Sequence, residues 1–377
     1  MTINVNSRDL LYWYDTNARK MPWRIPPKRI KKGEKPDPYK IWLSEIMLQQ
    51  TTVATVESYF INFISMWPKI SDLANANDDK VMAAWAGLGY YARARNLLKC
   101  ARIVVSEFNG VFPTDINDLQ TLPGIGPYTS AAIAAIAFDK SETVMDGNVE
   151  RVISRIYAIQ KPLPKAKAVL FKGAEKITPK RRAGDYAQAI MDLGSTVCLP
   201  KNPRCDICPW KQSCLGKFRG IESSLPIKIK KKLKPLRYGI IYVAKRKDGS
   251  WLLERREPKG LLGGMLGWPG SEWSGEPYES APVVTTWVTS KNLVRHVFSH
   301  FTLQLKVKVA IVPENIKPTV GFFYNDDQFM KSDLPKLMQK VFDVALLELK
   351  KTPLQKKRGR SYCNFTACIG DLVLAHF

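Results

Sequence analysis

The stretch LPGIGPYTSAAIAAIAF, residues 122–138, decides the fold that the sequence predicts. A turn containing Gly124 and Gly126 leads directly into a helix of alanine and isoleucine. Glycine lets the backbone approach an anion closely, and a helix N-terminus offers unpaired N–H groups at the positive end of its dipole. Because apolar residues at helical spacing also precede the turn, we expect a helix-hairpin-helix that binds a nucleic-acid phosphate without reading bases. An ordinary tight turn is the alternative, since G-x-G alone is common.

The residues around this motif share its helical periodicity. Apolar residues recur every three or four positions in 41–56, 80–105, 129–138 and 186–198. Pro, Gly and Asp or Asn residues separate these segments. The pattern predicts an all-α domain over residues 1–216.

The chain changes character after this domain. Residues 217–237 contain eight Lys or Arg residues and one acid, which predicts a solvated linker that either lies along phosphates or only repels itself. The stretches RYGIIYVAK and SWLLERRE predict a β-hairpin, and residues 301–309 alternate as in a half-buried strand. A helical period returns in 333–350, so residues 238–377 are expected to form an α+β domain.

Composition restricts the class of partner. The 377 residues carry 58 Lys and Arg against 34 Asp and Glu, a net charge of +24, and 45% are hydrophobic. Such an excess predicts an anionic polymer, most often nucleic acid, although a lysine-rich proteome would produce it too. No run approaches the roughly 18 apolar residues of a membrane span, and the N-terminus lacks the apolar core of a signal peptide. We therefore expect a cytoplasmic protein without membrane contact.

Four of the seven cysteines are close together in the sequence and predict one metal centre. Cys198, Cys205, Cys208 and Cys214 follow the spacing C-x6-C-x2-C-x5-C. This spacing permits zinc or a [4Fe–4S] cluster, and it favours iron–sulfur because zinc sites usually pair two C-x2-C knuckles. Nothing nearby is typical of an electron-transfer module, so a structural role is the favoured interpretation.

Two carboxylates stand out by their sequence context. Glu45 lies on an apolar helical stripe, where burial would raise the pKa of the carboxyl and make it a general acid at neutral pH. A carboxylate in a salt bridge is the alternative. Asp146 begins Asp-Gly-Asn before a helix, and on this evidence alone it is a helix N-cap.

Taken together, several stretches resemble adenine DNA glycosylases of the MutY type, within the endonuclease III helix-hairpin-helix superfamily. They are WLSEIMLQQT, WAGLGYYARARNL, LPGIGPYT, MDGNVERV, the four cysteines at their spacing, and RHVFSH. The resemblance runs through most of residues 9–305. It implies an all-α helix-hairpin-helix glycosylase domain with a four-cysteine iron–sulfur loop at 198–214, followed by an α+β Nudix-like domain that senses 8-oxoguanine.

The resemblance also implies a reaction. A monomer would excise adenine opposite 8-oxoguanine or guanine in double-stranded DNA, with a [4Fe–4S] cluster as cofactor. Glu45 would protonate adenine and Asp146 would stabilise the positive sugar, as two carboxylates divide the work of glycoside hydrolysis. Tyr128 and Asn148 would orient these groups. The adenine pocket would be lined by Trp23, Arg24 and Gln188.

Further residues match DNA-contacting positions of the family. Gln50 and Tyr90 would fill the space left by the flipped base, and extruding that base costs a few kcal/mol. Thr51 and Leu88 would lie beside the opposite base. The hairpin glycines would contact phosphate, and the opposite base would be sensed by Phe298, Ser299 and His300.

Departures from related patterns separate the alternatives. Tyr128 stands where bifunctional relatives have a lysine, so a Schiff base cannot form and a monofunctional enzyme is expected. A thymine-mismatch glycosylase is the nearest alternative, and a non-catalytic damage-binding protein would need neither Glu45 nor Asp146. A Nudix pyrophosphatase is disfavoured because the acidic run after GGMLGWPG is missing. About ten extra residues, 25–34, would reshape the pocket rim, contact phosphate or form a surface insert.

Overall fold

The computed structural model describes residues 5–229, 233–257, 260–298, 300–325 and 329–351. The chain divides into two compact units, Met1–Leu233 and Lys234–Phe377, and each is treated by itself. No helix in the described part of the chain is long and apolar enough to span a membrane.

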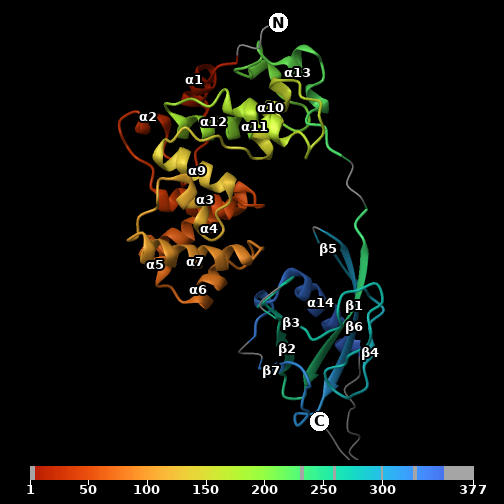
Figure 1. Cartoon of the computed structure of the whole chain (residues 1–377). Coiled ribbons are helices and arrows are strands. Elements are labelled where there is room, and N and C mark those ends of the chain that lie inside the picture. The colour runs from red at the N-terminus through yellow and green to blue at the C-terminus, as the bar shows by residue number, and fades with distance from the viewer. Residues whose placement is uncertain (1–4, 230–232, 258–259, 299, 326–328, 352–377) are drawn as a thin grey trace, which may run out of the picture. The chain divides into compact units, whose positions relative to one another are not determined.

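The first unit is helical throughout, as the periodicity predicts (Figure 1). Its helices are α1 (Ser7–Asn17), α2 (Pro27–Ile30), α3 (Pro38–Leu48), α4 (Val53–Met66), α5 (Ile70–Ala74), α6 (Asp78–Ala84), α7 (Ala92–Glu107), α8 (Ile116–Thr121), α9 (Pro127–Phe138), α10 (Gly147–Ile156), α11 (Lys167–Glu175), α12 (Ala183–Thr196) and α13 (Leu215–Phe218), with 3-10 turns at Cys205–Ile207 and Glu222–Ser224. Helices α8 and α9 form the expected hairpin around residues 122–126.

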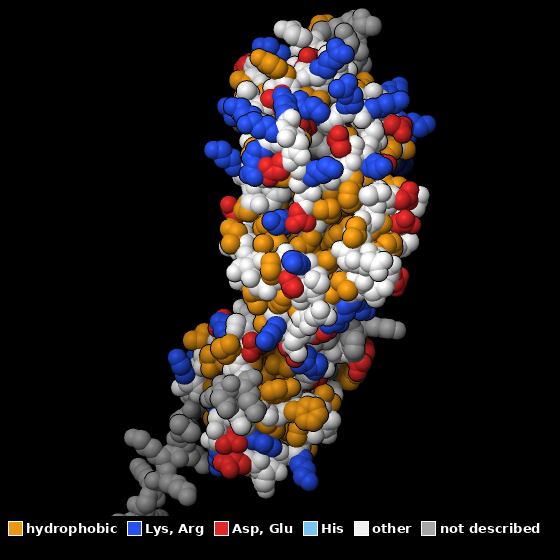
Figure 2. Space-filling model, turned by 90° about the vertical axis from the view of Figure 1, so that its left-hand side faces the viewer, with side chains coloured by type: hydrophobic (Ala, Val, Ile, Leu, Met, Phe, Trp, Pro, Cys, Tyr) orange, Lys and Arg blue, Asp and Glu red, His pale blue; other side chains and the backbone are white. Residues whose placement is uncertain are grey.

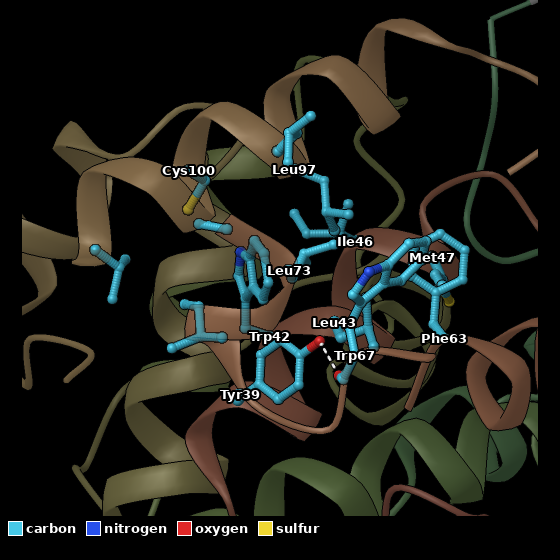
Figure 3. Close-up of a cluster of buried hydrophobic side chains, with 14 of the residues drawn as sticks. Tyr39, Trp42, Leu43, Ile46, Met47, Phe63, Trp67, Leu73, Leu97 and Cys100 are labelled. Carbon is cyan, nitrogen blue, oxygen red and sulfur yellow. Dashed lines mark hydrogen bonds between the residues drawn. The ribbon is translucent and has the colours of Figure 1, made fainter. Parts of the chain in front are cut away.

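Two hydrophobic clusters make up the core of this unit, and α9 belongs to both. The first packs α3 and α4 against α5 and α7, and Figure 3 shows part of it, including the hydrogen bond from Tyr39 to the Trp67 carbonyl oxygen at 2.8 Å. The second packs α1, α9, α10 and α12 together. Small side chains allow this, because a Cβ added to Gly184 of α12 would lie 2.6 Å from the Ala135 carbonyl oxygen. Helix α9 thereby fixes the positions of the surrounding helices.

Two of the predicted helical segments are interrupted. Segment 41–56 breaks between α3 and α4, and segment 80–105 breaks between α6 and α7. Each break contains a non-glycine residue with a left-handed backbone, Gln50 at φ 59° and Tyr90 at φ 50°. Apolar spacing continues across both breaks, so periodicity alone did not separate the helices.

The segment around residues 25–34 is folded against the helical unit. It contains the short helix α2, and Arg29 pairs with Glu34 within it. Lys31 Nζ lies 2.7 Å from Asp15 Oδ2 on α1, which ties the insert to the unit. Glu34 and Lys35 line a cavity of about 530 Å³ beside Gln188.

The stretch expected to be a linker has contacts at both ends. Leu225 is buried, and its carbonyl oxygen accepts a hydrogen bond from Arg155 Nε at 3.1 Å. The Leu163 N–H bonds the Ile227 carbonyl oxygen at 2.8 Å. At the other end, residues from Leu236 onward belong to the first strand of the second unit. The division between the units falls after Leu233.

The second unit is a mixed sheet packed against a helix (Figure 1). The strands are β1 (Leu236–Arg246), β2 (Trp251–Arg255), β3 (Leu266–Gly267), β4 (Val288–Thr289), β5 (Val294–Val297), β6 (Thr302–Val312) and β7 (Phe322–Tyr324), followed by a 3-10 turn at Lys331–Asp333 and α14 (Lys336–Lys351). The hairpin of β1 and β2 and the strand expected at 301–309 are confirmed. Strands β1 and β6 pair in parallel from Leu236↔Thr302 to Arg246↔Val312.

Candidate active site in the helical unit

The helical unit contains a cavity of about 600 Å³ lined by residues from five parts of the chain. These are the segment before α2, α3 with the turn after it, α9, the start of α10, and α12. The cavity brings together nine of the residues proposed from the sequence: Trp23, Arg24, Glu45, Gln50, Thr51, Tyr128, Asp146, Asn148 and Gln188. Leu88, Tyr90, Gly124 and Gly126 lie outside its lining.

Glu45 is the buried acid of this cavity. Its side chain projects from α3, and the residue is only 7% exposed. Tyr128 of α9 donates a hydrogen bond to Glu45 Oε2 at 3.2 Å. Burial raises the pKa of Glu45 to about 7, while the Tyr128 hydrogen bond and the charge of Arg24 lower it and Asp146 raises it. A carboxyl with such a pKa can carry a proton at neutral pH and give it to a bound base.

Asp146 is the N-cap of α10, as the sequence predicted. Its Oδ1 accepts hydrogen bonds from the backbone N–H groups of Asn148 and Val149 at 2.9 and 2.7 Å, and its Oδ2 accepts one from Asn148 Nδ2 at 2.9 Å. Arg151 in turn donates to Asn148 Oδ1 at 2.8 Å. A Cβ on Gly194 would lie 2.6 Å from Asn148 Cβ, so α12 holds the amide in place. These contacts fix the carboxylate at the cavity wall.

Helix α12 contains, behind the cavity lining, a residue that the sequence reasoning missed. Asp192 is fully buried and pairs with Arg24 Nη1 and Arg19 Nε, each at 2.7 Å. Gln188, one turn earlier, lines the cavity, as does Met191, whose sulfur accepts a hydrogen bond from the Tyr128 hydroxyl at 3.3 Å. The available signal was an acid within the apolar run AIMDLG, the same signal that identified Glu45.

A second missed residue, Arg93, joins the two helix breaks. Its Nη1 donates to the carbonyl oxygens of Ile46 and Met47, both at 2.9 Å, at the end of α3. Its Nη2 donates to Thr51 Oγ1 and to the Leu88 carbonyl oxygen, both at 3.1 Å. One guanidinium therefore brings together the two residues proposed to lie beside the opposite base.

Tyr90, one of the two residues proposed to fill the space left by the flipped base, also lies near the Arg93 guanidinium. The Arg93 guanidinium carbon lies 5.6 Å from the centre of the Tyr90 ring. Tyr90 is 53% exposed, so much of its surface faces solvent. The turn after α3 and the turn before α7 are thus linked, although Tyr90 does not line the cavity.

The hairpin has the backbone that its glycines permit. Gly124 has φ 83°, and a Cβ there would lie 3.2 Å from Asn96 Cβ, so a larger residue would be strained in conformation and in space. Gly126 is the N-cap of α9 and has no side-chain cap, and Pro127 begins the helix. The first N–H groups of α9 are therefore not covered by a capping side chain, which suits an anion.

The four cysteines surround a separate small cavity, of about 30 Å³. As placed, no group of three or more His, Cys, Asp or Glu within the described ranges could hold a metal ion. All four thiols nevertheless line this one cavity, and Arg155 Nη1 donates to Cys198 Sγ at 3.2 Å. Backbone N–H groups also bond the sulfurs of Cys208 and Cys214. A set of four thiols with such donors fits a thiolate-bound centre.

The proposed sensing residues lie in the second unit, between β5 and β6. Phe298 stacks on Trp273 with ring centres 5.8 Å apart. The ring centre of His296, on β5 just before Phe298, lies 4.6 Å from that of Phe298. His300 is exposed, whereas Ser299 lies outside the described residues. Phe298 and His300 thus lie in the segment that joins β5 to β6.

Basic side chains are concentrated on one part of the helical unit. On the face shown in Figure 2, Lys and Arg gather over one end of this unit, and hydrophobic side chains are more frequent over the rest of it. Exposed basic residues of α11 and the neighbouring loops are Lys161, Lys165, Lys167, Lys172, Lys176, Lys180, Arg181, Lys201 and Arg204. Such a surface is typical of proteins that bind phosphate backbones.

Comparison with known proteins agrees with this fold. Residues 43–179 match the HhH-GPD superfamily of base excision DNA repair proteins, and residues 240–344 match the NUDIX domain. The helical unit thus defines the class, a helix-hairpin-helix protein of base excision repair. A solved thermostable thymine-DNA glycosylase is 27% identical over 56% of this chain and 95% of that one, with a TM-score of 0.49.

Relatives identify the family, and one of them matches over most of the chain. An adenine DNA glycosylase of Buchnera aphidicola subsp. Schizaphis graminum is 35% identical over 356 residues, covering 91% of this chain and 99% of the relative. That of Rattus norvegicus is 45% identical over 228 residues, covering 58% of this chain and 43% of the relative. The chain belongs to the adenine DNA glycosylase family, which makes it a DNA-binding hydrolase of base excision repair.

Proposed function

We propose that the enzyme is a monofunctional glycosylase that excises adenine opposite 8-oxoguanine or guanine and leaves an abasic site. The observation that supports this most is the pairing, in one cavity of about 600 Å³, of a buried acid, Glu45, with a half-buried carboxylate, Asp146, that accepts three N–H hydrogen bonds. The cavity volume suits a flipped purine, since ligand pockets span roughly 300–1,000 Å³. Trp23, Arg24 and Gln188 would line the base.

In the proposed reaction Glu45 gives its proton to N7 of adenine. The bond between N9 and the sugar then breaks, its electron pair stays with the base, and neutral adenine leaves. Asp146, held by Asn148, stabilises the positive charge that develops on the sugar. Water then adds to the sugar carbon and gives a proton to the Glu45 carboxylate, which restores the acid. Tyr128 has no amine, so the step that cuts the strand has no nucleophile at this position.

The proposal includes a [4Fe–4S] cluster held by Cys198, Cys205, Cys208 and Cys214. A bound cluster would supply a rigid anchor for the loop that follows α12. Burial raises the pKa of Cys208 to about 12 and also raises that of Cys214, so assembly would have to displace thiol protons. An absorbance scan with a metal assay tests this. A broad visible band with iron supports the proposal, and a colourless protein that contains zinc would overturn it.

The excision itself is tested with three duplexes, which carry A opposite 8-oxoguanine, A opposite G, and T opposite G. Strand breaks are compared with and without hot alkali. Breaks on the A strand that need alkali are expected. Spontaneous breaks would indicate a bifunctional lyase, release of T alone would indicate a thymine-mismatch glycosylase, and binding without any release would indicate a damage-binding protein.

We also propose that Phe298, Ser299 and His300 sense the opposite base. The enzyme would act as a monomer in the nucleoid. Changing Ser299→Ala together with His300→Ala should reduce the preference for 8-oxoguanine over G and leave excision opposite G nearly unchanged. Ser280→Ala, at an exposed position of the same unit, is the control. An equal loss on both substrates would argue against sensing by these residues.

A further inference from the structure

Asp192 is a buried acid to which the proposed reaction gives no role. It lies on α12 between Met191 and Leu193, and its side chain is 0% exposed. Its Oδ1 accepts a hydrogen bond from Arg19 Nε at 2.7 Å. Its Oδ2 accepts from Arg24 Nη1 at 2.7 Å and from the Arg19 backbone N–H at 3.1 Å. Three donors from a segment 168–173 residues away therefore converge on one carboxylate.

The carboxylate reaches the reaction only through its partner. Arg24 lines the cavity and its side chain is 8% exposed, whereas Asp192 is not part of the lining. Burial by itself would lower the pKa of Arg24, but the adjacent Asp192, together with Tyr14 and Glu45, outweighs it and raises that pKa. Arg24 is thus a fixed cation at the wall of the pocket, and Asp192 is the group that stabilises it there.

We propose that Asp192 is a positioning residue for adenine excision, whose buried carboxylate fixes the Arg24 guanidinium at the cavity wall and balances its charge beside Glu45. The inference rests on the proposed role of Glu45 as the general acid. The other groups that face Glu45 are Tyr128 of α9 and Asp146 at the start of α10. An unbalanced cation near a buried acid favours its ionised form, which cannot donate a proton. Pairing with Asp192 offsets the charge of Arg24 and so limits its stabilisation of ionised Glu45.

The net charge of the cluster formed by Arg19, Arg24 and Asp192 predicts that neutralising Asp192 and neutralising Arg24 shift the pKa of Glu45 in opposite directions. Arg19, Arg24 and Asp192 together carry +1. Asp192→Asn makes the cluster +2, Arg24→Gln makes it 0, and the double variant returns it to +1. A residue that only stabilises the fold would not produce shifts in this order.

The test is the pH dependence of single-turnover excision on a duplex with adenine opposite guanine. Activity should fall as pH rises through the pKa of the general acid. In Asp192→Asn this midpoint should move down by about one pH unit, so that excision above the midpoint is about tenfold slower. Arg24→Gln should move the midpoint up, and the double variant should restore it. The midpoint is the readout, because Arg24→Gln also removes a pocket contact and slows excision at every pH.

Asp185→Asn is the matched control, because Asp185 is another buried acid of α12, pairs with Arg182 at 2.7 Å, and does not line the adenine cavity. Its midpoint should stay in place. An unmoved midpoint in Asp192→Asn, or an equal shift in Asp185→Asn, would overturn the inference. If Asp192→Asn does not fold, Arg24→Gln decides, since Asp192 keeps Arg19 as a partner there. Activity in Glu45→Gln would overturn the proposed function instead.

Discussion

The two walls of the cavity surround a carboxyl group with opposite environments. On the α3 wall, Glu45 is buried, receives a hydrogen bond from Tyr128, and has a pKa raised to about 7. On the α10 wall, Asp146 accepts three N–H hydrogen bonds at the positive end of a helix. Burial favours the protonated carboxyl and N–H donors favour the anion.

This contrast shows how a protein assigns roles to two carboxyl groups. The middle of an apolar helix supplies few donors, because its N–H groups are already used within the helix. A helix N-terminus supplies several. The proposed general acid and the proposed charge stabiliser are therefore separated by where each lies on its helix, and substitutions on either wall can test that separation.

Glu45→Gln should give the largest effect. Glutamine keeps the shape but has no proton to give, so excision should slow by about 10²- to 10⁴-fold. Alkali-dependent breaks under single-turnover conditions measure the loss, and a gel-shift assay should show nearly unchanged duplex binding. Glu57→Gln, at an exposed position of α4, is the control. Full activity in Glu45→Gln would mean that the proton comes from another group.

Asp146→Asn should have the next largest effect. Asparagine is as good an N-cap as aspartate, so thermal stability should change little, but the negative charge beside the sugar is lost. We expect excision to slow by about 10²- to 10³-fold. Asp115→Asn is a matched control, because Asp115 caps α8 through the same kind of backbone hydrogen bonds, from Asn117 and Asp118. Comparable losses in both variants would point to capping rather than charge.

The α3 wall should also reduce stability at high pH. The pKa of Glu45 rises from 4.5 to about 7 on folding, a shift of about 2.5 units, or roughly 3 kcal/mol. Because the pKa of Glu45 is higher in the folded protein than in the unfolded chain, folding is favoured when the carboxyl is protonated. This contribution to the free energy of unfolding is complete below pH 4.5 and is lost as pH rises through 7. Urea titrations measure the free energy of unfolding of Glu45→Gln and of the wild type. The value for Glu45→Gln should rise relative to that of the wild type as pH increases from 5 to 8. A constant difference would show that Glu45 does not titrate in the folded protein.

Tyr128→Phe should give the smallest change. The hydrogen bond from Tyr128 lowers the pKa of Glu45, so its removal should raise that pKa. Glu45 would then keep its proton to higher pH, and the alkaline fall of the excision rate should move up by less than about one unit. Tyr186→Phe is the control, because among the described residues the Tyr186 hydroxyl has no partner. A shift to lower pH would contradict the assigned direction.

Features set by local chemistry could be predicted from the sequence. The hairpin, the N-cap at Asp146 and the alternating strand β6 depend on glycines, a short polar side chain and a period of two, all of which are local. Glu45 was identified because an acid in an apolar stripe is unusual. The family resemblance was needed to group Glu45 with Tyr128 and Gln188, which the fold brings to one cavity.

Features set by distant contacts could not be predicted. Arg93 acts on carbonyl oxygens 46 and 47 residues earlier, and Asp192 binds a segment near the N-terminus. The breaks at Gln50 and Tyr90 fall inside stretches whose apolar spacing continues unchanged. No local pattern marks them, apart from the glycines beside Tyr90.

The left-handed backbones at Gln50 and Tyr90 have a consequence for how damage is found. Such a conformation costs a non-glycine residue about 1–2 kcal/mol. Here that cost belongs to folding, because both residues hold this backbone within the folded helical unit. In the DNA-contacting role proposed for them, both turns would meet a duplex already formed. The pace of scanning would then be set by how readily a base pair opens.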